Sequence, residues 1–344
     1  MSHQNSTFRF RGRRYQVQGR ITVRHRTYGL LQLLSRRGSA SIVRDDCDRG
    51  CEERWLVSEL GQKTLRELRS LQVLPERLSR QKLRVLQQLT DANPFAAAII
   101  DCERRDHMTL IVSQWIPGES LSEWLRRQTG SRRRVSLHEA LRLYRGLVRA
   151  LSGFHRTTGL VHGDIHPDNF VMGSRSKWLI PIDYGSAWHA LDAMSQRQTQ
   201  GFRALWAAPE INLGKIGDQR SDQFSATLLL FVMLTGELPF DRLGGRAACF
   251  ANPDSEPFWE RPTDVILRYH SISHSATGSL SRFLDQVLAA DPQERFATDA
   301  AWMSATEQLF RQLTESSRKG SLFDQLLKML RTLRNRGRDI SSIE

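Results

Sequence analysis

Three oxygen-bearing side chains in the middle of the chain could support phosphoryl transfer. Asp164 and Asn169 lie five residues apart, and Asp183 follows a strand-like run at 178–182. Phosphoryl transfer needs a carboxylate that orients the attacking hydroxyl and accepts its proton, and oxygen ligands that hold magnesium against the phosphates. Asp164 suits the first role. Asn169 and Asp183 suit the second, because magnesium prefers a few protein oxygens alongside phosphate oxygens.

The elements that must position these residues are predicted from apolar periodicity and capping signals. From Tyr28 to about Val112, short apolar runs broken by Gly, Pro and charge predict a small sheet with one helix. Helices are predicted to dominate thereafter. Ser136 and Glu139 form a capping-box pair that opens a helix; its predicted apolar face is Tyr144, Leu147, Val148, Leu151 and Phe154. Asp222 is predicted to cap an almost wholly apolar, buried helix through Leu234.

Several motifs, in order, resemble those of the eukaryotic-type (Hanks-type) serine/threonine protein kinase family over roughly residues 28–310. The matching segments are His162-Gly163-Asp164 for the family's His-Arg-Asp, Asp183-Tyr184-Gly185 for its Asp-Phe-Gly, Ala208-Pro209-Glu210 for its Ala-Pro-Glu, Asp222-Gln223-Phe224-Ser225 for the start of its central helix, and Asp291-Pro292 with Arg295. The resemblance implies an α+β, two-lobed fold with a small β-rich N-lobe at about 28–113 and a larger, mainly helical C-lobe at about 117–315.

The resemblance also implies contacts within the larger lobe. Asp222 would hold the backbone of the catalytic loop, and Arg295 would pair with Glu210. Tyr184 and His162 would belong to an internal column of packed side chains.

ATP and Mg²⁺ are the cofactors that the resemblance implies. Asp164 would be the base, with Asn169 and Asp183 as metal ligands, and His166 stands where serine/threonine kinases keep a lysine near the transferred phosphate. The implied adenine and phosphate contacts are Gly38 in the Gly-rich loop, Ser113 as the gatekeeper, Gln114 and Ile116 at the hinge, and Val171 beneath the adenine.

The chain departs from the family at the phosphate-binding lysine and its helix glutamate. Two alignments with the family are possible here. The first starts from Val43 and places the lysine position near Ser58, with Glu67 at the position of the helix glutamate. The second counts back from Asn93-Pro94, so that 71–75 is the strand that normally carries the lysine and Gln72 takes the place of the lysine. The helix is then 79–89, with Lys82 or Arg84 where the glutamate belongs. The second alignment is preferred, and neither supplies the lysine. Gly163 also replaces the arginine that, in the family, usually contacts the activation loop when that loop is phosphorylated.

Three functions are compatible with these features. The first is an ATP-dependent protein kinase that acts on serine or threonine. The second is a pseudokinase scaffold, because the lysine–glutamate pair is missing. The third is a small-molecule phosphotransferase, because the segment 162–169 is also similar to the catalytic loop of aminoglycoside and choline kinases. The Ala-Pro-Glu segment and the paired arginine favour the protein kinase.

The 344 residues carry a formal net charge of +13, with 40% hydrophobic and 25% charged residues, which is typical of a soluble globular protein. No acidic residue precedes Asp45, so residues 1–27 are predicted to form a basic leader. Residues 316–344 are predicted to form a basic amphipathic tail. Either could bind an acidic partner, although no nucleic-acid or membrane motif accompanies them. Four cysteines and no apolar leader predict a cytoplasmic location. The protein substrate is not specified.

Overall fold

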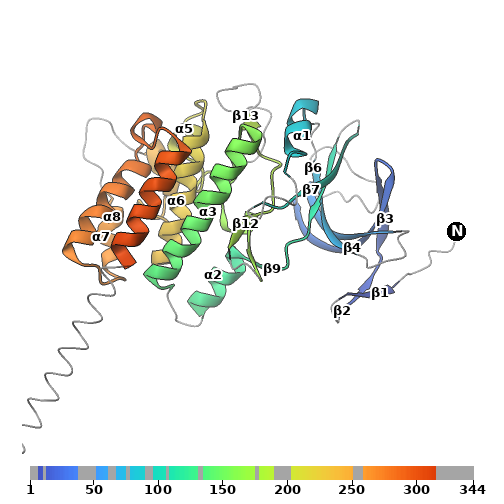
Figure 1. The fold of residues 1–344 in the computed structure, drawn as a ribbon, viewed down its shortest axis with the longest axis horizontal. Helices are drawn as coiled ribbons and strands as arrows, with labels where there is room; N and C mark the ends of the chain where they lie inside the picture. The colour runs from blue at the N-terminus through green and yellow to red at the C-terminus, as the bar shows by residue number, and fades with distance from the viewer. Residues whose placement is uncertain are drawn as a thin grey trace, which may run out of the picture. The chain divides into compact units, whose positions relative to one another are not determined.

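A six-stranded antiparallel sheet dominates the first third of the chain in the computed structural model (Figure 1). Its strands follow the spatial order β3-β4-β5-β6-β8-β7. They are β3 (Gly19–Val23), β4 (Arg26–Arg37), β5 (Glu52–Glu59), β6 (Leu68–Leu74), β7 (Ile99–Arg104) and β8 (Thr109–Gln114). The structure describes residues 7–10, 13–37, 52–60, 67–74, 78–89, 96–105, 108–130, 135–174, 178–189, 203–250 and 259–314.

Side chains on opposite faces of this sheet enter different apolar clusters. Trp55 of β5 and Leu71 of β6 belong to a cluster on one face. Leu74 of β6 and Ile111 of β8 belong to a cluster on the other face. Because successive side chains of a strand point to opposite faces, residue 72 shares the face of Leu74 and Ile111.

Shorter strands and helices make up much of the remaining chain before residue 190. The remaining strands and short helices before residue 190 are β1 (Thr7–Phe10), β2 (Arg13–Gln16), α1 (Arg80–Leu86), β9 (Gly118–Ser120), β10 (Leu160–Val161), η2 (Pro167–Asn169), β11 (Phe170–Gly173), β12 (Leu179–Pro181) and β13 (Trp188–His189). The strands β12, β11 and β9 form a three-stranded sheet. The strand pairs β1–β2 and β10–β13 form two-stranded sheets.

The remaining helices are α2 (Leu121–Gly130), α3 (Leu137–Thr158), α5 (Pro209–Asn212), α6 (Gln219–Thr235), η3 (Gly244–Cys249), α7 (Pro262–Leu267), α8 (His274–Val287) and η4 (Pro292–Glu294). Residues 299–314 are also helical. The predicted apolar face of α3, from Tyr144 to Phe154, is buried throughout. The Glu139 amide donates to Ser136 Oγ at 3.2 Å, which confirms the predicted cap.

The predicted cap of the buried helix was wrong by one turn. Asp218, not Asp222, is the N-cap of α6, and its carboxylate accepts a hydrogen bond from the Arg220 amide. The first turn of α6 carries polar side chains, so the start of the apolar run does not mark the start of the helix. At the other end, Gly236 adopts a left-handed conformation with φ of 87°, which suits glycine at a helix C-terminus.

The described strands and helix decide between the two alignments of the small lobe. The first alignment placed Ser58 at the lysine position and Glu67 at the position of the helix glutamate. Ser58 lies on β5, but Glu67 directly precedes the strand β6 and is not on a helix, so this alignment was wrong. Gln72 lies on β6 and Lys82 on α1, as the preferred alignment predicted. The helix is shorter than the predicted 79–89, and Ser79 caps it by accepting the Lys82 amide.

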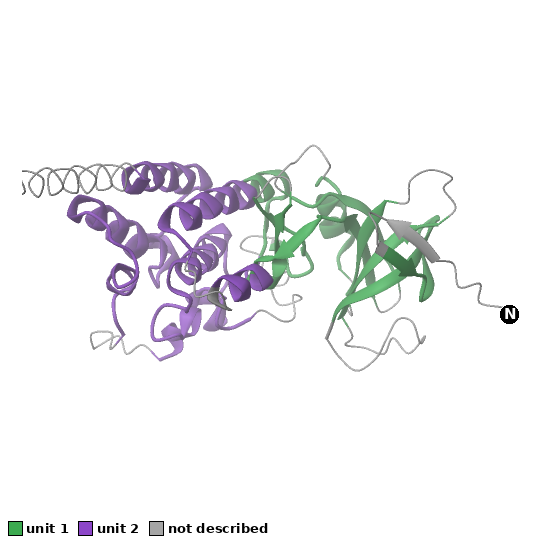
Figure 2. Cartoon of the chain, turned by 90° about the horizontal axis from the view of Figure 1, so that it is seen from below, with its two compact units in different colours: residues 1–121, 153–162, 167–201 green, residues 122–152, 163–166, 202–344 purple. Residues whose placement is uncertain are grey.

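The chain divides into two compact units, coloured separately in Figure 2. Unit 1 contains residues 1–121, 153–162 and 167–201. Unit 2 contains residues 122–152, 163–166 and 202–344. No helix in the described ranges is long and apolar enough to cross a bilayer. The predicted tail at 316–344 lies outside the described residues.

Candidate functional site

Asp183 in unit 1 is held by side chains from the sheet and by a backbone amide. It follows β12 and is 8% exposed. Its Oδ1 accepts hydrogen bonds from Gln72 Nε2 at 2.7 Å and from the Gly185 amide at 2.9 Å. Its Oδ2 forms an ion pair with the Arg54 guanidinium. Burial raises the pKa of Asp183, but Arg54, the Gly185 amide and Gln72 outweigh it, and the pKa lies below its ordinary value.

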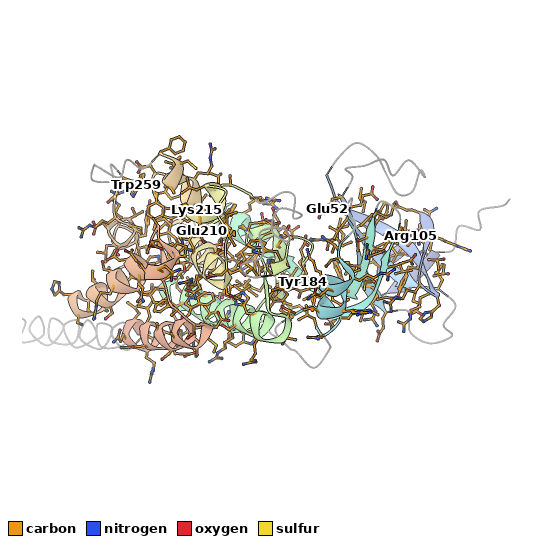
Figure 3. All side chains as sticks on the ribbon, turned by 90° about the horizontal axis from the view of Figure 1, so that it is seen from above. Glu52, Arg105, Tyr184, Glu210, Lys215 and Trp259 are labelled. Carbon is orange, nitrogen blue, oxygen red and sulfur yellow. The ribbon has the colours of Figure 1, made fainter. Side chains whose placement is uncertain are left out.

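Neighbouring strands deliver Arg54 and Gln72 to the same carboxylate. Arg54 of β5 lies directly opposite Gln72 of β6, and Gln72 lies opposite Ile111 of β8. Cross-strand partners point to the same face of a sheet, so the three side chains form a row. Glu52, labelled in Figure 3, lies two residues before Arg54 on β5 and accepts a hydrogen bond from Gln72 Nε2 at 3.1 Å.

Sequence reasoning missed Arg54, which lies on β5 and belongs to none of the motifs that resemble the family. The alternation of Arg54, Leu56 and Ser58 with Trp55 and Val57 was the available signal for a strand.

Asn169 and Asp183 lie at adjacent ends of one hairpin. Phe170 of β11 pairs with Pro181 of β12, and the Ile182 amide donates to the Asn169 carbonyl oxygen at 3.0 Å. Asn169 is buried. An ionised carboxylate and an amide side chain at neighbouring backbone positions form a donor set that fits Mg²⁺, a hard cation that takes oxygen ligands.

Packed rings hold the Asp183 turn in place. The Tyr184 ring (Figure 3) stacks on Phe154 at 5.4 Å between centroids, and His162 contacts both Tyr184 and Phe170. Tyr184 Oη also accepts the Ala97 amide at 2.9 Å. Burial raises the pKa of Tyr184, so the phenol stays neutral. The ring contacts of Tyr184 with His162 agree with the predicted packing.

Lys82 connects α1 to the same turn. Its ammonium donates to the Gly185 carbonyl oxygen at 2.7 Å, and the side chain is buried. Gly185 is tightly enclosed, because a Cβ there would lie 2.8 Å from Leu74 Cδ2 and 3.1 Å from Gln72 Nε2. A lysine of α1 therefore bonds the Asp183–Gly185 turn, and it is one of the two residues, with Arg84, predicted at the position of the helix glutamate.

The predicted adenine-contacting residues also lie in unit 1. Ile116 and Val171 are buried in the same apolar cluster as Ile111 and Tyr184. The Gln114 amide donates to the Ala98 carbonyl oxygen at 2.8 Å. The strands β9 and β11 pair closely after the hinge, where Gly173 lies opposite Gly118.

Gly118 tolerates no side chain at this pairing, since an added Cβ would lie 2.0 Å from the Met172 carbonyl oxygen. The predicted loop glycine, Gly38, lies outside the described residues, between β4 and β5.

Asp164 and His166 lie in unit 2. His166 Nε2 is 3.3 Å from Asp164 Oδ2, and both side chains are buried. The Gly163 amide donates to Asp222 Oδ1 at 3.0 Å, which confirms the predicted contact between Asp222 and the catalytic loop. Gly163 has φ of 78°, a left-handed conformation that favours glycine over the family's arginine.

A buried ion pair joins two distant segments of unit 2. Arg295 Nη1 and Nη2 donate to the two Glu210 carboxylate oxygens at 2.9 and 2.8 Å. Ser221 Oγ donates to Glu210 Oε1 at 2.6 Å. This bidentate contact confirms the pairing that the motifs predicted.

The sequence is similar to those of known protein kinases. A family model described as "Protein kinase domain" matches residues 53–309. The serine/threonine-protein kinase PksC of Streptomyces coelicolor is 26% identical over 282 residues, which are 80% of this chain and 47% of that protein. The probable serine/threonine-protein kinase PknB of Bifidobacterium longum is 29% identical over 212 residues, 58% of this chain and 26% of that protein. The chain spans about half or less of the length of such curated relatives.

Solved structures show the same fold at low sequence identity. The kinase domain of Mycobacterium tuberculosis PknI superposes with a TM-score of 0.55 at 18% identity, over 84% of this chain and 97% of that one. The Cydia pomonella granulovirus kinase PK-1 superposes with a TM-score of 0.53 at 18% identity, over 80% of this chain and 92% of that one. The α+β fold with a β-rich N-lobe and a helical C-lobe is therefore confirmed.

Proposed function

Because the chain belongs to the protein kinase domain family, we propose that it transfers the γ-phosphate of ATP to a serine or threonine hydroxyl of a protein. The observation that carries this proposal is the ionised Asp183, held by Gln72 and Gly185 on the hairpin that also bears Asn169. The protein kinase family model and the serine/threonine kinases among the relatives do not favour a small-molecule phosphotransferase.

Each proposed role follows from side-chain chemistry. Asp183 and Asn169 hold Mg²⁺, which neutralises phosphate charge when it is bound. Asp164 orients the substrate hydroxyl and accepts its proton. His166, with Nε2 3.3 Å from the Asp164 carboxylate, helps to orient that carboxylate. Adenine is proposed to bind the backbone of Gln114 and Ile116.

Calorimetric binding of ATP tests this proposal. The affinity of the full chain for ATP should rise when Mg²⁺ is added, and Asp183→Asn should remove that increase, because the amide lacks the charge that attracts the metal. Adenosine, which carries no phosphate, should bind the wild type and Asp183→Asn alike and so report an intact fold.

A suitable control is Asp285→Asn, since Asp285 is an exposed carboxylate on α8. This variant should keep the magnesium effect. A wild type that binds no ATP, or an Asp183→Asn variant with an undiminished magnesium effect, would contradict the proposal.

A further inference from the structure

The strand position that carries a phosphate-binding lysine in this family is neutral in this chain. Gln72 occupies it on β6, and its amide is bonded to Asp183 Oδ1 and Glu52 Oε1. An amide group supplies no positive charge for the α- and β-phosphates of ATP. If the chain binds ATP as proposed above, another cation is needed at this place.

Arg54 lies one strand away from the vacant lysine position and on the same face. It is the direct cross-strand partner of Gln72, and such partners have Cβ atoms about 5 Å apart. Its guanidinium reaches the Asp183 carboxylate, with the side chain 13% exposed. Arg54 therefore brings its charge to the metal-ligand carboxylate from a neighbouring strand.

A second basic side chain also contacts this turn. Lys82 Nζ donates to the backbone carbonyl oxygen of Gly185. It thereby fixes the turn from α1. Among the described residues, the ion pair to Asp183 is made by Arg54.

We propose that Arg54 is the cation that binds the α- and β-phosphates of ATP in this chain, in place of the strand lysine at position 72. The proposal rests on the function proposed above. A guanidinium suits the role because it stays charged and its planar fork can bond two phosphate oxygens at once. Gln72 and the Gly185 amide remain hydrogen-bonded to Asp183 Oδ1 when the Arg54 guanidinium binds phosphate instead of Asp183. The carboxylate therefore keeps its orientation.

If the phosphate-binding charge has moved from position 72 to position 54, moving it back should restore MgATP binding to a variant that lacks Arg54. Arg54→Met removes the charge and keeps an extended apolar stem. In the double variant Arg54→Met/Gln72→Lys, the charge returns on the partner strand at the family's own position. If Arg54 only stabilised the sheet, a lysine at position 72 would not restore the MgATP binding that Arg54→Met loses.

The test is calorimetric titration of the full chain with MgATP, MgADP and adenosine. Arg54→Met should weaken MgATP and MgADP binding at least about tenfold, as expected for a lost charge-assisted contact, and leave adenosine affinity within about twofold. The double variant should recover most of the MgATP affinity. Arg26→Met is the matched control, because Arg26 pairs with Glu59 in the same sheet; its affinities should match the wild type.

The outcomes separate this inference from the proposed function. If the wild type binds MgATP and Arg54→Met binds it equally well, Arg54 is not the phosphate-binding cation, although the proposed function survives. If the wild type binds neither MgATP nor adenosine, both fail. If Arg54→Met also loses adenosine through unfolding, the double variant decides: restored MgATP binding supports the inference, and unrestored binding in a folded double variant overturns it.

Discussion

The Lys82 ammonium donates a hydrogen bond to the Gly185 carbonyl oxygen, 2.7 Å away, in a buried setting. This contact joins α1 to the turn that carries Asp183. Lys82→Met keeps most of the side-chain volume and leaves the buried carbonyl without this donor. We expect the free energy of unfolding to fall by about 1–3 kcal/mol, the usual cost of an unsatisfied buried group.

Urea denaturation followed by tryptophan fluorescence measures this loss. Arg84→Met, in the last turn of the same helix, is the control and should change stability by less than about 0.5 kcal/mol. A Lys82→Met variant as stable as the wild type would show that the contact does not hold the turn.

The ion pair between Glu210 and Arg295 should matter far more for stability than surface pairs in the same unit. Both side chains are almost fully buried, so Arg295→Met leaves a carboxylate charge without its partner. The expected loss is about 3–5 kcal/mol. Arg242→Met breaks the exposed pair with Glu237 and should cost less than about 1 kcal/mol. Equal losses for the two variants in urea denaturation would contradict the assignment.

The pair between Arg54 and Asp183 predicts a specific pH dependence. The pKa of Asp183 lies below its ordinary value, so its ionised form stabilises the fold above the unfolded-state pKa of about 3.9, and this contribution is lost as the pH falls through the lower folded-state pKa. Arg54→Met removes the largest of the interactions that lower the pKa of Asp183, so this pKa should be higher in the variant than in the wild type. The stability gap between wild type and Arg54→Met should therefore widen as the pH rises through about 4 toward neutrality.

Denaturation at a series of pH values measures this gap. Repeating the series in an Asp183→Asn background should remove its pH dependence, because the titrating group is gone. A gap that is constant with pH in the native background would mean that Arg54 does not act on Asp183.

The proximity of His166 to Asp164 predicts a kinetic effect. His166→Ala should lower kcat for phosphate transfer at least about tenfold, because the base loses an orienting partner, with little change in KM for ATP. His166→Lys, which restores the family residue, should retain activity. His274→Ala, at an exposed position on α8, serves as the control. An unchanged kcat for His166→Ala would remove His166 from the proposed machinery.

The landmarks of the larger lobe could be predicted because their residues belong to short motifs that resemble those of the protein kinase family. The Glu210–Arg295 pair and the contact of Asp222 with Gly163 join segments far apart in the sequence, and the resemblance implied both of them. The N-cap of α6 could not be predicted, because Asp218 and Asp222 both precede the apolar run and periodicity does not distinguish them.

The cation beside Asp183 could not be identified from the sequence for a different reason. Arg54 reaches Asp183 only because β5 and β6 pair in a register that places Arg54 opposite Gln72. A shift of one residue would turn Arg54 to the other face. That register is a property of the pairing between β5 and β6, which a local sequence pattern does not reveal.

Transfer of labelled γ-phosphate from ATP, with Mg²⁺, to a generic protein substrate and to the chain itself tests the central claim most directly. We predict label with the wild type and a loss of at least about 100-fold for Asp164→Asn, since the amide cannot accept the hydroxyl proton, while Asp285→Asn labels normally. Absence of transfer by folded wild type, or equal transfer by Asp164→Asn, would contradict the account.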